Sequence, residues 1–229
     1  MKQGAIFDEF ANKYDEWFDT PQGKIVKELE LNLLIEFIRP QKGKKMLEVG
    51  IGTGLFALEF RKRGMDIRGI DPSYEMLSIA KKRGFEVKYG TGENIPYPDE
   101  TFDVVLAMTS MEFSKEPDKF ITEMKRTAKD NGIIVVAVLN ALSFYGISRR
   151  VKGIFKKSVF DRAHFYTYWE LKHLLTKHLY NVETSSSVFL IPNSPNWILQ
   201  RANSLERFGR RYCAQFGALI VGKGGKNVY

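Results

Sequence analysis

Hydrophobic positions recur at two different spacings that alternate along the middle of the chain. Short continuous apolar runs, which are typical of buried strands, occur at residues 45–50, 66–71, 86–90, 101–108 and 133–139. Segments with the three-to-four spacing of an amphipathic helix lie between them, at residues 54–64, 73–84 and 116–132. Strands that alternate with helices of this length predict βαβ units, and therefore a parallel sheet with helices on both faces.

The amino-terminal residues 5–38 show a helical pattern in two pieces, which a turn-like segment at residues 19–23 divides. The second piece places Ile25, Leu29 and Leu33 on one apolar stripe. We therefore expect a helical segment ahead of the first strand.

The pattern changes after Leu139. Residues 141–163 are aromatic and basic without a clear period, and residues 167–179 predict a further helix. Two more strands are predicted at residues 181–191 and 212–223, and the polar residues between them have no assigned element. Because the sequence shows neither a repeat nor a linker, we expect one domain over the whole chain.

Composition narrows the class of protein. The 229 residues suit one α/β domain, with 44% hydrophobic and 27% charged residues. The single cysteine, Cys213, rules out an internal disulfide and a cysteine-type metal site. No apolar run reaches the length of a membrane span, and the first ten residues lack the apolar core of a signal peptide. We expect a cytoplasmic protein without a metal.

The net charge of +8 is unevenly distributed along the chain. Residues 1–140 contain 21 Lys and Arg against 23 Asp and Glu, whereas residues 141–229 contain 14 against 4. Such an excess is compatible with an ordinary solvated surface. It is equally compatible with a basic face that attracts an acidic substrate, nucleic acid or anionic lipid.

A glycine-rich loop with the sequence LEVGIGTG occupies residues 47–54, between a predicted strand and a predicted helix. Glycines at this point let a ligand approach the backbone closely, because no Cβ intervenes. Asp71 ends the next strand, 21 residues after Gly50, where a carboxylate can accept hydrogen bonds from two ribose hydroxyls. A triphosphate loop would need Gly-Lys-Ser/Thr, and a dinucleotide loop would need glycine at Leu55. Neither of these two loops fits the sequence.

Together with "GIDPSYEML" (69–77) and "YGTGENIPYPDETFDVVLAM" (89–108), this loop resembles the class I S-adenosylmethionine-dependent methyltransferases. The likeness is to the methyltransferase type 11 group, which includes ubiquinone and menaquinone methyltransferases. It implies a three-layer αβα Rossmann-like, doubly wound sheet of about seven strands, mostly parallel with an antiparallel last strand, plus an amino-terminal helical cap. The implied parts are a cap at 1–40, a cofactor-binding core at 41–140, and substrate-recognition elements with the final strand pair at 141–229.

The resemblance also implies roles for individual residues toward S-adenosylmethionine. Glu48 would lie beside the methionine moiety and Asp71 would bind the ribose. Thr91 stands where relatives usually have aspartate beside the adenine, so backbone contacts would replace a carboxylate there. The full set of implied cofactor-binding residues is Tyr14, Trp17, Glu48, Gly50, Gly52, Gly54, Asp71, Pro72, Ser73, Met76, Thr91, Gly92, Glu93, Met108 and Thr109.

The chemistry of methyl transfer does not require one particular catalytic residue. The leaving group is a neutral thioether, so proximity and alignment carry the reaction, and a general base matters only when the acceptor must lose a proton. His164 and Tyr166 are candidates for such a role, whereas His173 and His178 read as surface residues. A catalytic residue is therefore not assigned.

Three functions remain open at this stage. The first is methyl transfer to a small-molecule acceptor, with anionic and lipid-like compounds both compatible with the basic carboxy-terminal third. The second is a protein that binds S-adenosylmethionine without catalysis, or an RNA-directed methyltransferase. Nucleic acid is less favoured because no RNA-binding module and no Asn-Pro-Pro-Tyr motif is present. The third, an NAD-dependent oxidoreductase, is opposed by Leu55.

Overall fold

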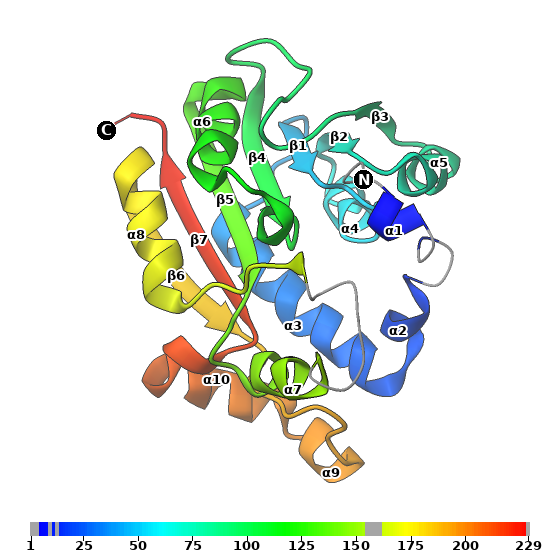
Figure 1. Cartoon of the computed structure of the whole chain (residues 1–229), viewed down its shortest axis with the longest axis vertical. Coiled ribbons are helices and arrows are strands. Elements are labelled where there is room, and N and C mark those ends of the chain that lie inside the picture. The colour runs from blue at the N-terminus through cyan, green and yellow to red at the C-terminus, as the bar shows by residue number, and fades with distance from the viewer. Residues whose placement is uncertain (1–4, 9–10, 12–13, 154–161, 228–229) are drawn as a thin grey trace.

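The computed structural model describes residues 5–8, 11, 14–153 and 162–227 of the chain. Within these residues, seven strands form one mixed sheet in the order β3-β2-β1-β4-β5-β7-β6 (Figure 1). The strands are β1 (Lys45–Val49), β2 (Asp66–Asp71), β3 (Glu86–Tyr89), β4 (Phe102–Met108), β5 (Ala128–Leu139), β6 (Tyr180–Ser187) and β7 (Leu219–Gly225). Only β7 runs antiparallel to its neighbours, β5 and β6. The predicted sheet, mostly parallel with an antiparallel last strand, is confirmed.

Helices cover both faces of this sheet. They are α1 (Ala5–Asp8), α2 (Glu16–Asp19), α3 (Pro21–Ile38), α4 (Ala57–Lys62), α5 (Tyr74–Lys82), α6 (Pro117–Thr127), α7 (Phe144–Gly153), α8 (Tyr168–His178), α9 (Asn196–Leu199) and α10 (Ala202–Tyr212). On one face, Phe37 of α3 and Phe60 of α4 enter one buried apolar cluster. On the other face, Phe120 of α6 and Leu171 of α8 enter a second cluster. The molecule is therefore a three-layer αβα structure.

Local capping interactions explain where several helices begin. Thr20 accepts a hydrogen bond from the backbone N–H of Gly23 at 3.0 Å, and Pro21 occupies the first turn of α3. Helix α3 therefore starts inside the segment that the sequence pattern assigned to a turn. Thr167 and Glu170 form a reciprocal capping box at the start of α8.

The boundary between α6 and β5 differs from the prediction. Residues 128–132 were expected to complete a helix, but α6 ends at Thr127 and the strand begins at Ala128. Ala128 pairs with Phe102, and a bulge follows before the pairing resumes at Val104 and Ile133. The helical prediction for residues 128–132 is wrong because the pairing of Ala128 with Phe102 starts the strand at this point and overrides local propensity.

The carboxy-terminal third contains helices that the sequence pattern did not indicate. Helix α7 lies in the segment without a clear period, and α9 and α10 occupy the polar stretch before the last strand. Helix α10 extends to Tyr212, so β7 starts at Leu219 and not at residue 212 as expected. Residues 154–161 of the basic segment lie outside the described residues.

Candidate cofactor-binding site

A cavity of about 610 Å³ opens at the carboxyl ends of β1, β2 and β4. Strand β4 pairs with β1 although β2 and β3 precede it in the chain, so the strand order reverses here. Such a switch point is where open α/β sheets bind their ligands. Of the residues that the sequence analysis singled out, the cavity is lined by Tyr14, Gly50, Gly52, Asp71, Pro72, Met76, Thr91, Gly92, Glu93, Met108, Thr109 and His164, and Glu112 lines it as well.

The glycine loop forms the floor of this cavity. The N–H groups of Gly50 and Ile51 both donate to the carbonyl of Ile70, at 2.8 and 2.9 Å. Gly52 has a φ of 55°, and the nearest atom to a Cβ added there would be Met76 Sδ at 4.0 Å. The space beside Gly52 is therefore open, and a ligand can reach the backbone.

Asp71 holds the loop from the neighbouring strand. Its Oδ2 accepts from the Gly52 N–H at 2.9 Å, and its Oδ1 accepts from the Ser73 N–H at 2.8 Å. The residue is only 7% exposed, and burial raises its pKa to about 6 although both N–H donors oppose the shift. Each oxygen retains a lone pair, so the carboxylate can accept further hydrogen bonds from a pair of hydroxyls.

Four expected cofactor-binding residues do not line this cavity: Trp17, Glu48, Gly54 and Ser73. Glu48 lies within β1, is 3% exposed, and its Oε2 has no hydrogen-bond partner. Burial raises the Glu48 pKa to about 8, with a smaller contribution from the charge of Asp71. A buried carboxylate oxygen without a partner fits a site that receives a cationic group or an ordered water. Gly54 packs against Phe85, and Ser73 caps α5.

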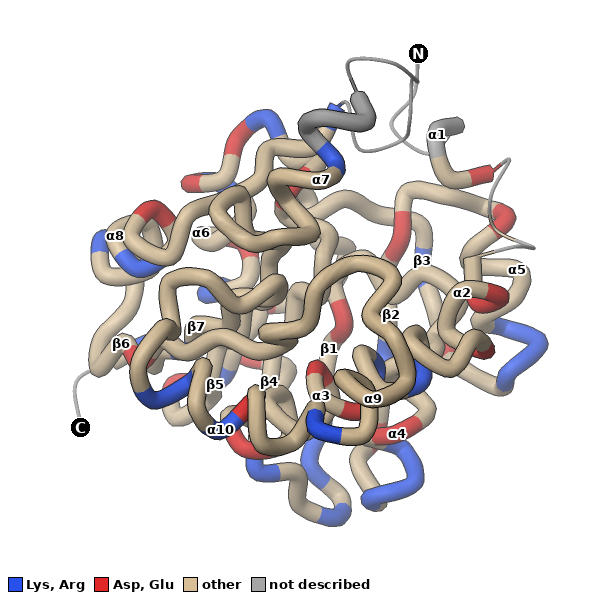
Figure 2. Tube along the Cα trace, turned by 90° about the horizontal axis from the view of Figure 1, so that it is seen from below, with Lys and Arg blue, Asp and Glu red and all other residues tan. Residues whose placement is uncertain are grey.

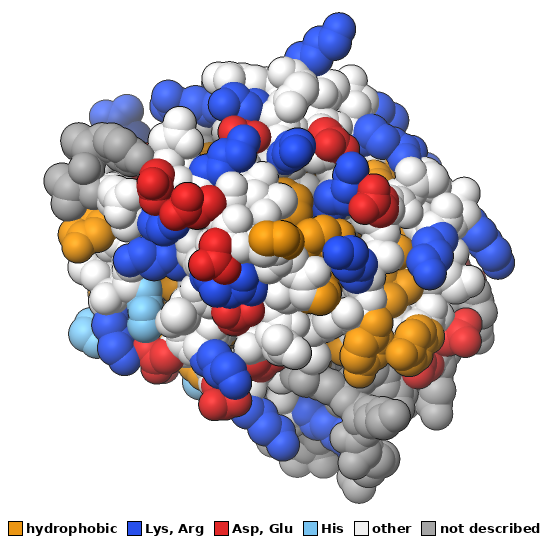
Figure 3. All heavy atoms as spheres, turned by 90° about the horizontal axis from the view of Figure 1, so that it is seen from above, with side chains coloured by type: hydrophobic (Ala, Val, Ile, Leu, Met, Phe, Trp, Pro, Cys, Tyr) orange, Lys and Arg blue, Asp and Glu red, His pale blue; other side chains and the backbone are white. Residues whose placement is uncertain are grey.

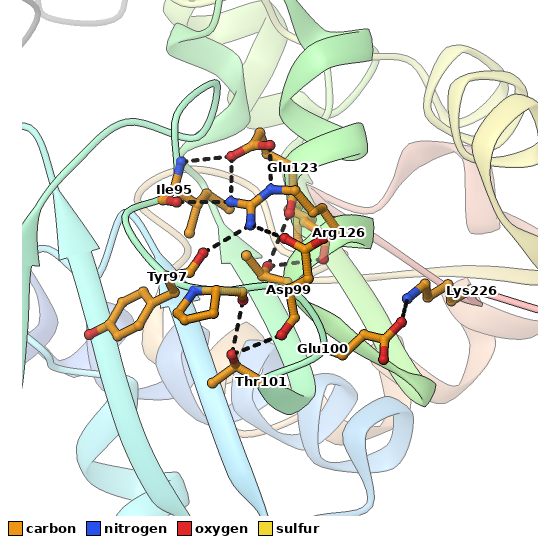
Figure 4. Close-up of polar contacts among 11 residues, drawn as sticks. Ile95, Tyr97, Asp99, Glu100, Thr101, Glu123, Arg126 and Lys226 are labelled. Carbon is orange, nitrogen blue, oxygen red and sulfur yellow. Dashed lines mark hydrogen bonds and ion pairs between the residues drawn. The ribbon is translucent and has the colours of Figure 1, made fainter.

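The far end of the cavity is bounded by the segment around Glu93. Glu93 accepts a hydrogen bond from the Ser114 hydroxyl, and the chain then continues into an irregular stretch. The Arg126 guanidinium supports that stretch by donating to the carbonyls of Ile95 and Tyr97, each at 2.9 Å (Figure 4). Glu123 holds the same guanidinium at 2.7 and 2.8 Å. Arg126 of α6 therefore supports the backbone next to the segment that is expected to lie beside the adenine. No local sequence motif indicates this contact.

The amino-terminal segment is tied to the glycine loop by polar contacts. Asp15 accepts from the Thr53 hydroxyl at 2.8 Å and forms an ion pair with Arg83. Asp8 accepts from the Ser73 hydroxyl. These contacts link α1 and α2 to two structural elements that surround the cavity.

The aromatic residues of this segment divide between two cavities. Tyr14 lines both of them and is hydrogen-bonded to Thr109, and burial raises its pKa. Trp17 lines only the second cavity, of about 330 Å³. Thr109 ends β4 with a φ of 47°, a left-handed conformation that is uncommon for threonine and clusters at functional sites.

The second cavity adjoins the first and is mostly apolar. Its walls are Phe7, Tyr14, Trp17, Phe18, Glu30, Phe56, Met108, Thr109, Phe113, Leu139, Tyr145, Arg149, Val188 and Ala218. Phe7, Tyr14, Met108, Thr109 and Phe113 also line the first cavity. Glu30 is 8% exposed and burial raises its pKa to about 8, although the charge of Arg149 opposes this shift. Glu30 and Arg149 thus face a cavity whose other walls are mostly aromatic and aliphatic.

The two candidates for a catalytic role lie in different surroundings. His164 lines the first cavity, and its backbone N–H donates to the carbonyl of Glu112 at 2.7 Å. Tyr166 is 5% exposed and packs in the core cluster beneath α8, away from both cavities. His164 remains a candidate for contact with a ligand, whereas Tyr166 contributes to packing.

Sequence reasoning missed other residues of the first cavity. They are Phe7, Val49, Gly90, Ser110, Phe113, Ser114, Lys115, Phe120 and Arg162. Val49 and Gly90 lie within the quoted motifs and Ser110 follows one of them, so their proximity could have been inferred from the sequence. Phe120 lies on α6, outside all of the quoted motifs. No group of His, Cys, Asp and Glu suited to a metal ion occurs among the described residues. No helix in the described part of the chain is long and apolar enough to cross a membrane.

The buried carboxyls predict that stability depends on pH. Burial raises the pKa values of Glu30 and Glu48 to about 8, and that of Glu112 to about 7, whereas the unfolded chain titrates near 4.5. Between these values the folded state keeps protons that the unfolded state has released, so stability falls as the pH rises from about 5 to about 8. We expect a lower melting temperature at pH 8 than at pH 6.

The variant Glu48→Gln isolates one contribution to this dependence. It should recover about 2 kcal/mol of the free energy of unfolding that one such group loses between pH 6 and pH 8. Urea unfolding at the two pH values measures the difference. A slope that is unchanged in Glu48→Gln, or a stability that rises with pH, would contradict the assignment.

The sheet order and the reversed last strand define the Rossmann-like methyltransferase class. A family model described as a methyltransferase domain matches residues 47–136. The chain is 35% identical to an uncharacterized protein of Methanocaldococcus jannaschii, over 80% of this chain and 85% of that protein. It is 29% identical to the demethylmenaquinone methyltransferase of Renibacterium salmoninarum, over 61% and 60% of the two chains.

Among solved structures, a Thermotoga maritima protein is similar over nearly the whole length. It is described as an S-adenosylmethionine-dependent methyltransferase and possible histamine N-methyltransferase. The TM-score is 0.77 at 28% identity, covering 97% of this chain and 99% of that one. The chain belongs to the S-adenosylmethionine-dependent methyltransferases, and S-adenosylmethionine is its cofactor.

Proposed function

We propose that this protein transfers a methyl group to a small apolar or lipid-like acceptor bound in the second cavity. One observation carries the proposal: Tyr14, Met108 and Thr109 line both the mostly apolar second cavity and the larger first cavity. A cofactor in the first cavity and an acceptor in the second would therefore approach each other at the end of β4, where the two cavities adjoin. The relative from Renibacterium salmoninarum, named for demethylmenaquinone, supports an apolar acceptor.

The larger cavity is the proposed place of the cofactor. Asp71 would accept from the ribose hydroxyls, and the open backbone at Gly52 would admit the methionine end. Glu48, with its unpartnered Oε2, would attract the ammonium group, directly or through water. The backbone from Thr91 to Glu93, with Pro72 and Met76, would bound the adenine.

Bound S-adenosylmethionine supplies an electrophilic methyl group on a sulfonium. The protein would contribute mainly alignment, because Tyr14 and Thr109 orient both ligands and α1 and α2 exclude water from them. His164 lines the cofactor cavity and is a candidate to take a proton from an acceptor that must lose one. The proposed domain organisation keeps residues 1–40 as a cap, 41–140 as the cofactor core and 141–229 as the acceptor side.

The direct test combines a binding and a transfer measurement. Calorimetric titration with S-adenosylhomocysteine should show binding, and a methyl-labelled cofactor should transfer its label to a component of a lipid extract. Label found only in an aqueous metabolite extract would overturn the apolar acceptor. Binding without transfer to either extract would favour a non-catalytic binding protein.

The variant Trp17→Ala separates the two cavities. Trp17 lines the second cavity and not the first. Because its side chain is 43% exposed, its loss should leave the fold intact. We expect the KM for the acceptor to rise about tenfold, the effect of losing one half-buried aromatic contact. The affinity for S-adenosylhomocysteine should stay within about twofold of wild type. A loss of cofactor affinity instead would place Trp17 over the cofactor.

A further inference from the structure

Helices α7, α9 and α10 lie together at one end of the molecule (Figure 1). Their inner sides share one buried cluster, because Leu199 of α9 and Ala202 of α10 belong to it and Tyr145 of α7 packs against it. Their outer sides therefore lie at the same end of the molecule. We call their exposed residues the aromatic-basic face, which consists of Phe144, Ile147, Trp197, Arg201, Leu205, Phe208, Arg211 and Tyr212.

The large apolar side chains of this face are exposed to solvent. Trp197 and Tyr212 are each 62% exposed, and Phe144 and Phe208 are each 60% exposed. In α10 the residues Leu205, Phe208 and Tyr212 follow helical spacing and form one stripe. An exposed cluster of this kind is more than scattered surface apolarity and marks an interaction site.

The charge of the face is positive. Arg201 and Arg211 are exposed, and no ion pair joins them to an acid in the part of the chain that the structure describes. The one acid of α10, Glu206, is 9% exposed and accepts the backbone N–H of Val188 at 2.9 Å. Figure 2 views this end of the molecule, and Figure 3 shows the opposite end, where acidic and basic side chains alternate.

We propose that the aromatic-basic face docks on the surface of an anionic lipid bilayer. Tryptophan, tyrosine and phenylalanine beside arginine suit the boundary between headgroups and acyl chains, where one end of a side chain is apolar and the other meets phosphate. The aliphatic Ile147 and Leu205 bury in acyl chains but have no counterpart on a nucleic acid. Arg201 and Arg211 have no acidic partner among the described residues, so an anionic lipid surface would attract them more strongly than an apolar protein surface.

The position of α7 links this docking to the second cavity, where the acceptor is proposed to bind. Phe144 and Ile147 of α7 belong to the face, and Tyr145 and Arg149 of the same helix line the second cavity. A docked molecule would hold that cavity next to the bilayer. The docking itself requires neither cofactor nor methyl transfer, so its test is independent of the proposed function.

The test measures partitioning of the full chain onto vesicles. We expect binding to vesicles of mixed phosphatidylcholine and phosphatidylglycerol, weakened by added salt, and little binding to phosphatidylcholine alone. The double variant Trp197→Ser and Phe208→Ser should lower the partition coefficient at least about tenfold. The matched control is Trp169→Ser, because Trp169 is 57% exposed on α8, outside the face.

A charge variant tests the basic part of the face. Arg201→Gln with Arg211→Gln should lower partitioning onto anionic vesicles about tenfold. The control pair, Lys81→Gln with Lys82→Gln, removes two exposed charges from α5 and should have little effect. Circular dichroism confirms the fold of each variant before partitioning is compared.

A fluorescence measurement avoids relying on loss of binding. Since the chain has three tryptophans, replacing Trp17 and Trp169 with phenylalanine leaves Trp197 as the reporter. Its emission should shift to the blue on addition of anionic vesicles. The proposal is overturned if wild type does not bind them or if Trp169→Ser weakens binding equally. It is also overturned if the face variants abolish binding of single-stranded RNA or dissociate a dimer while vesicle binding persists.

Discussion

Replacing Asp71 with asparagine is expected to weaken the binding of S-adenosylhomocysteine by about 100-fold, since hydrogen bonds to a charged group are worth about 1.5–3 kcal/mol each. The wild-type carboxylate accepts from Gly52 at 2.9 Å and from Ser73 at 2.8 Å, which leaves both oxygens directed at N–H groups. An asparagine amide must turn its NH₂ toward one of these donors. The loop geometry and the ribose contact should be lost together.

The matched control for this variant is Asp66→Asn. Asp66 lies at the opposite end of the same strand, where it pairs with Arg68 on the surface. It should change the affinity by less than about twofold, as expected for a distant site. Calorimetric titration of both variants makes the comparison. An Asp71→Asn protein that folds and binds like wild type would show that this carboxylate does not hold the cofactor.

The second large effect is expected for Gly50→Ala, which should lower the free energy of unfolding by about 3 kcal/mol. Gly50 has a φ of 80°, a conformation that a residue with a Cβ adopts only under strain. The added Cβ would also lie 2.4 Å from the Ser110 Cβ, so the end of β4 would have to move. Cofactor affinity should fall as well, because both strand ends line the cavity.

Gly43→Ala separates backbone strain from the clash. Gly43 has the same φ of 80°, but no atom lies within 4 Å of an added Cβ. Gly43→Ala should lower the free energy of unfolding only by the backbone strain, about 1 kcal/mol, and should leave the cofactor affinity unchanged. Urea unfolding of both variants gives the difference. Equal losses of stability would mean that Ser110 yields without cost.

Much of the candidate site could be predicted from short stretches of sequence. Gly50, Gly52 and Asp71 lie in contiguous motifs whose hydrophobic context assigns them to strand ends, and the structure brings all three to one cavity. Glu48 shows the limit of that reasoning, because its side chain is 3% exposed and is not among the residues that line the cavity. A motif specifies the course of the backbone but not how deeply each side chain is buried.

Longer-range contacts were beyond local patterns. Arg126 braces the segment after Glu93 from a helix more than twenty residues away, and nothing beside Arg126 in the sequence indicates that partner. The end of α6 at Thr127 is decided by strand pairing. The contacts of Asp15 with Thr53 and Arg83 likewise join three separate segments.

By itself, the sequence determined the alternation of strands and helices, the glycine loop and the resemblance to methyltransferases, because each depends on periodicity or spacing within a few tens of residues. Only the tertiary structure decided which side chains share a cavity, that a mostly apolar second cavity adjoins the cofactor site, and that Trp197 and Phe208 lie at one exposed end. The physical reason is that burial and contact arise between segments far apart in the chain. Their energies depend on packing that no single segment specifies.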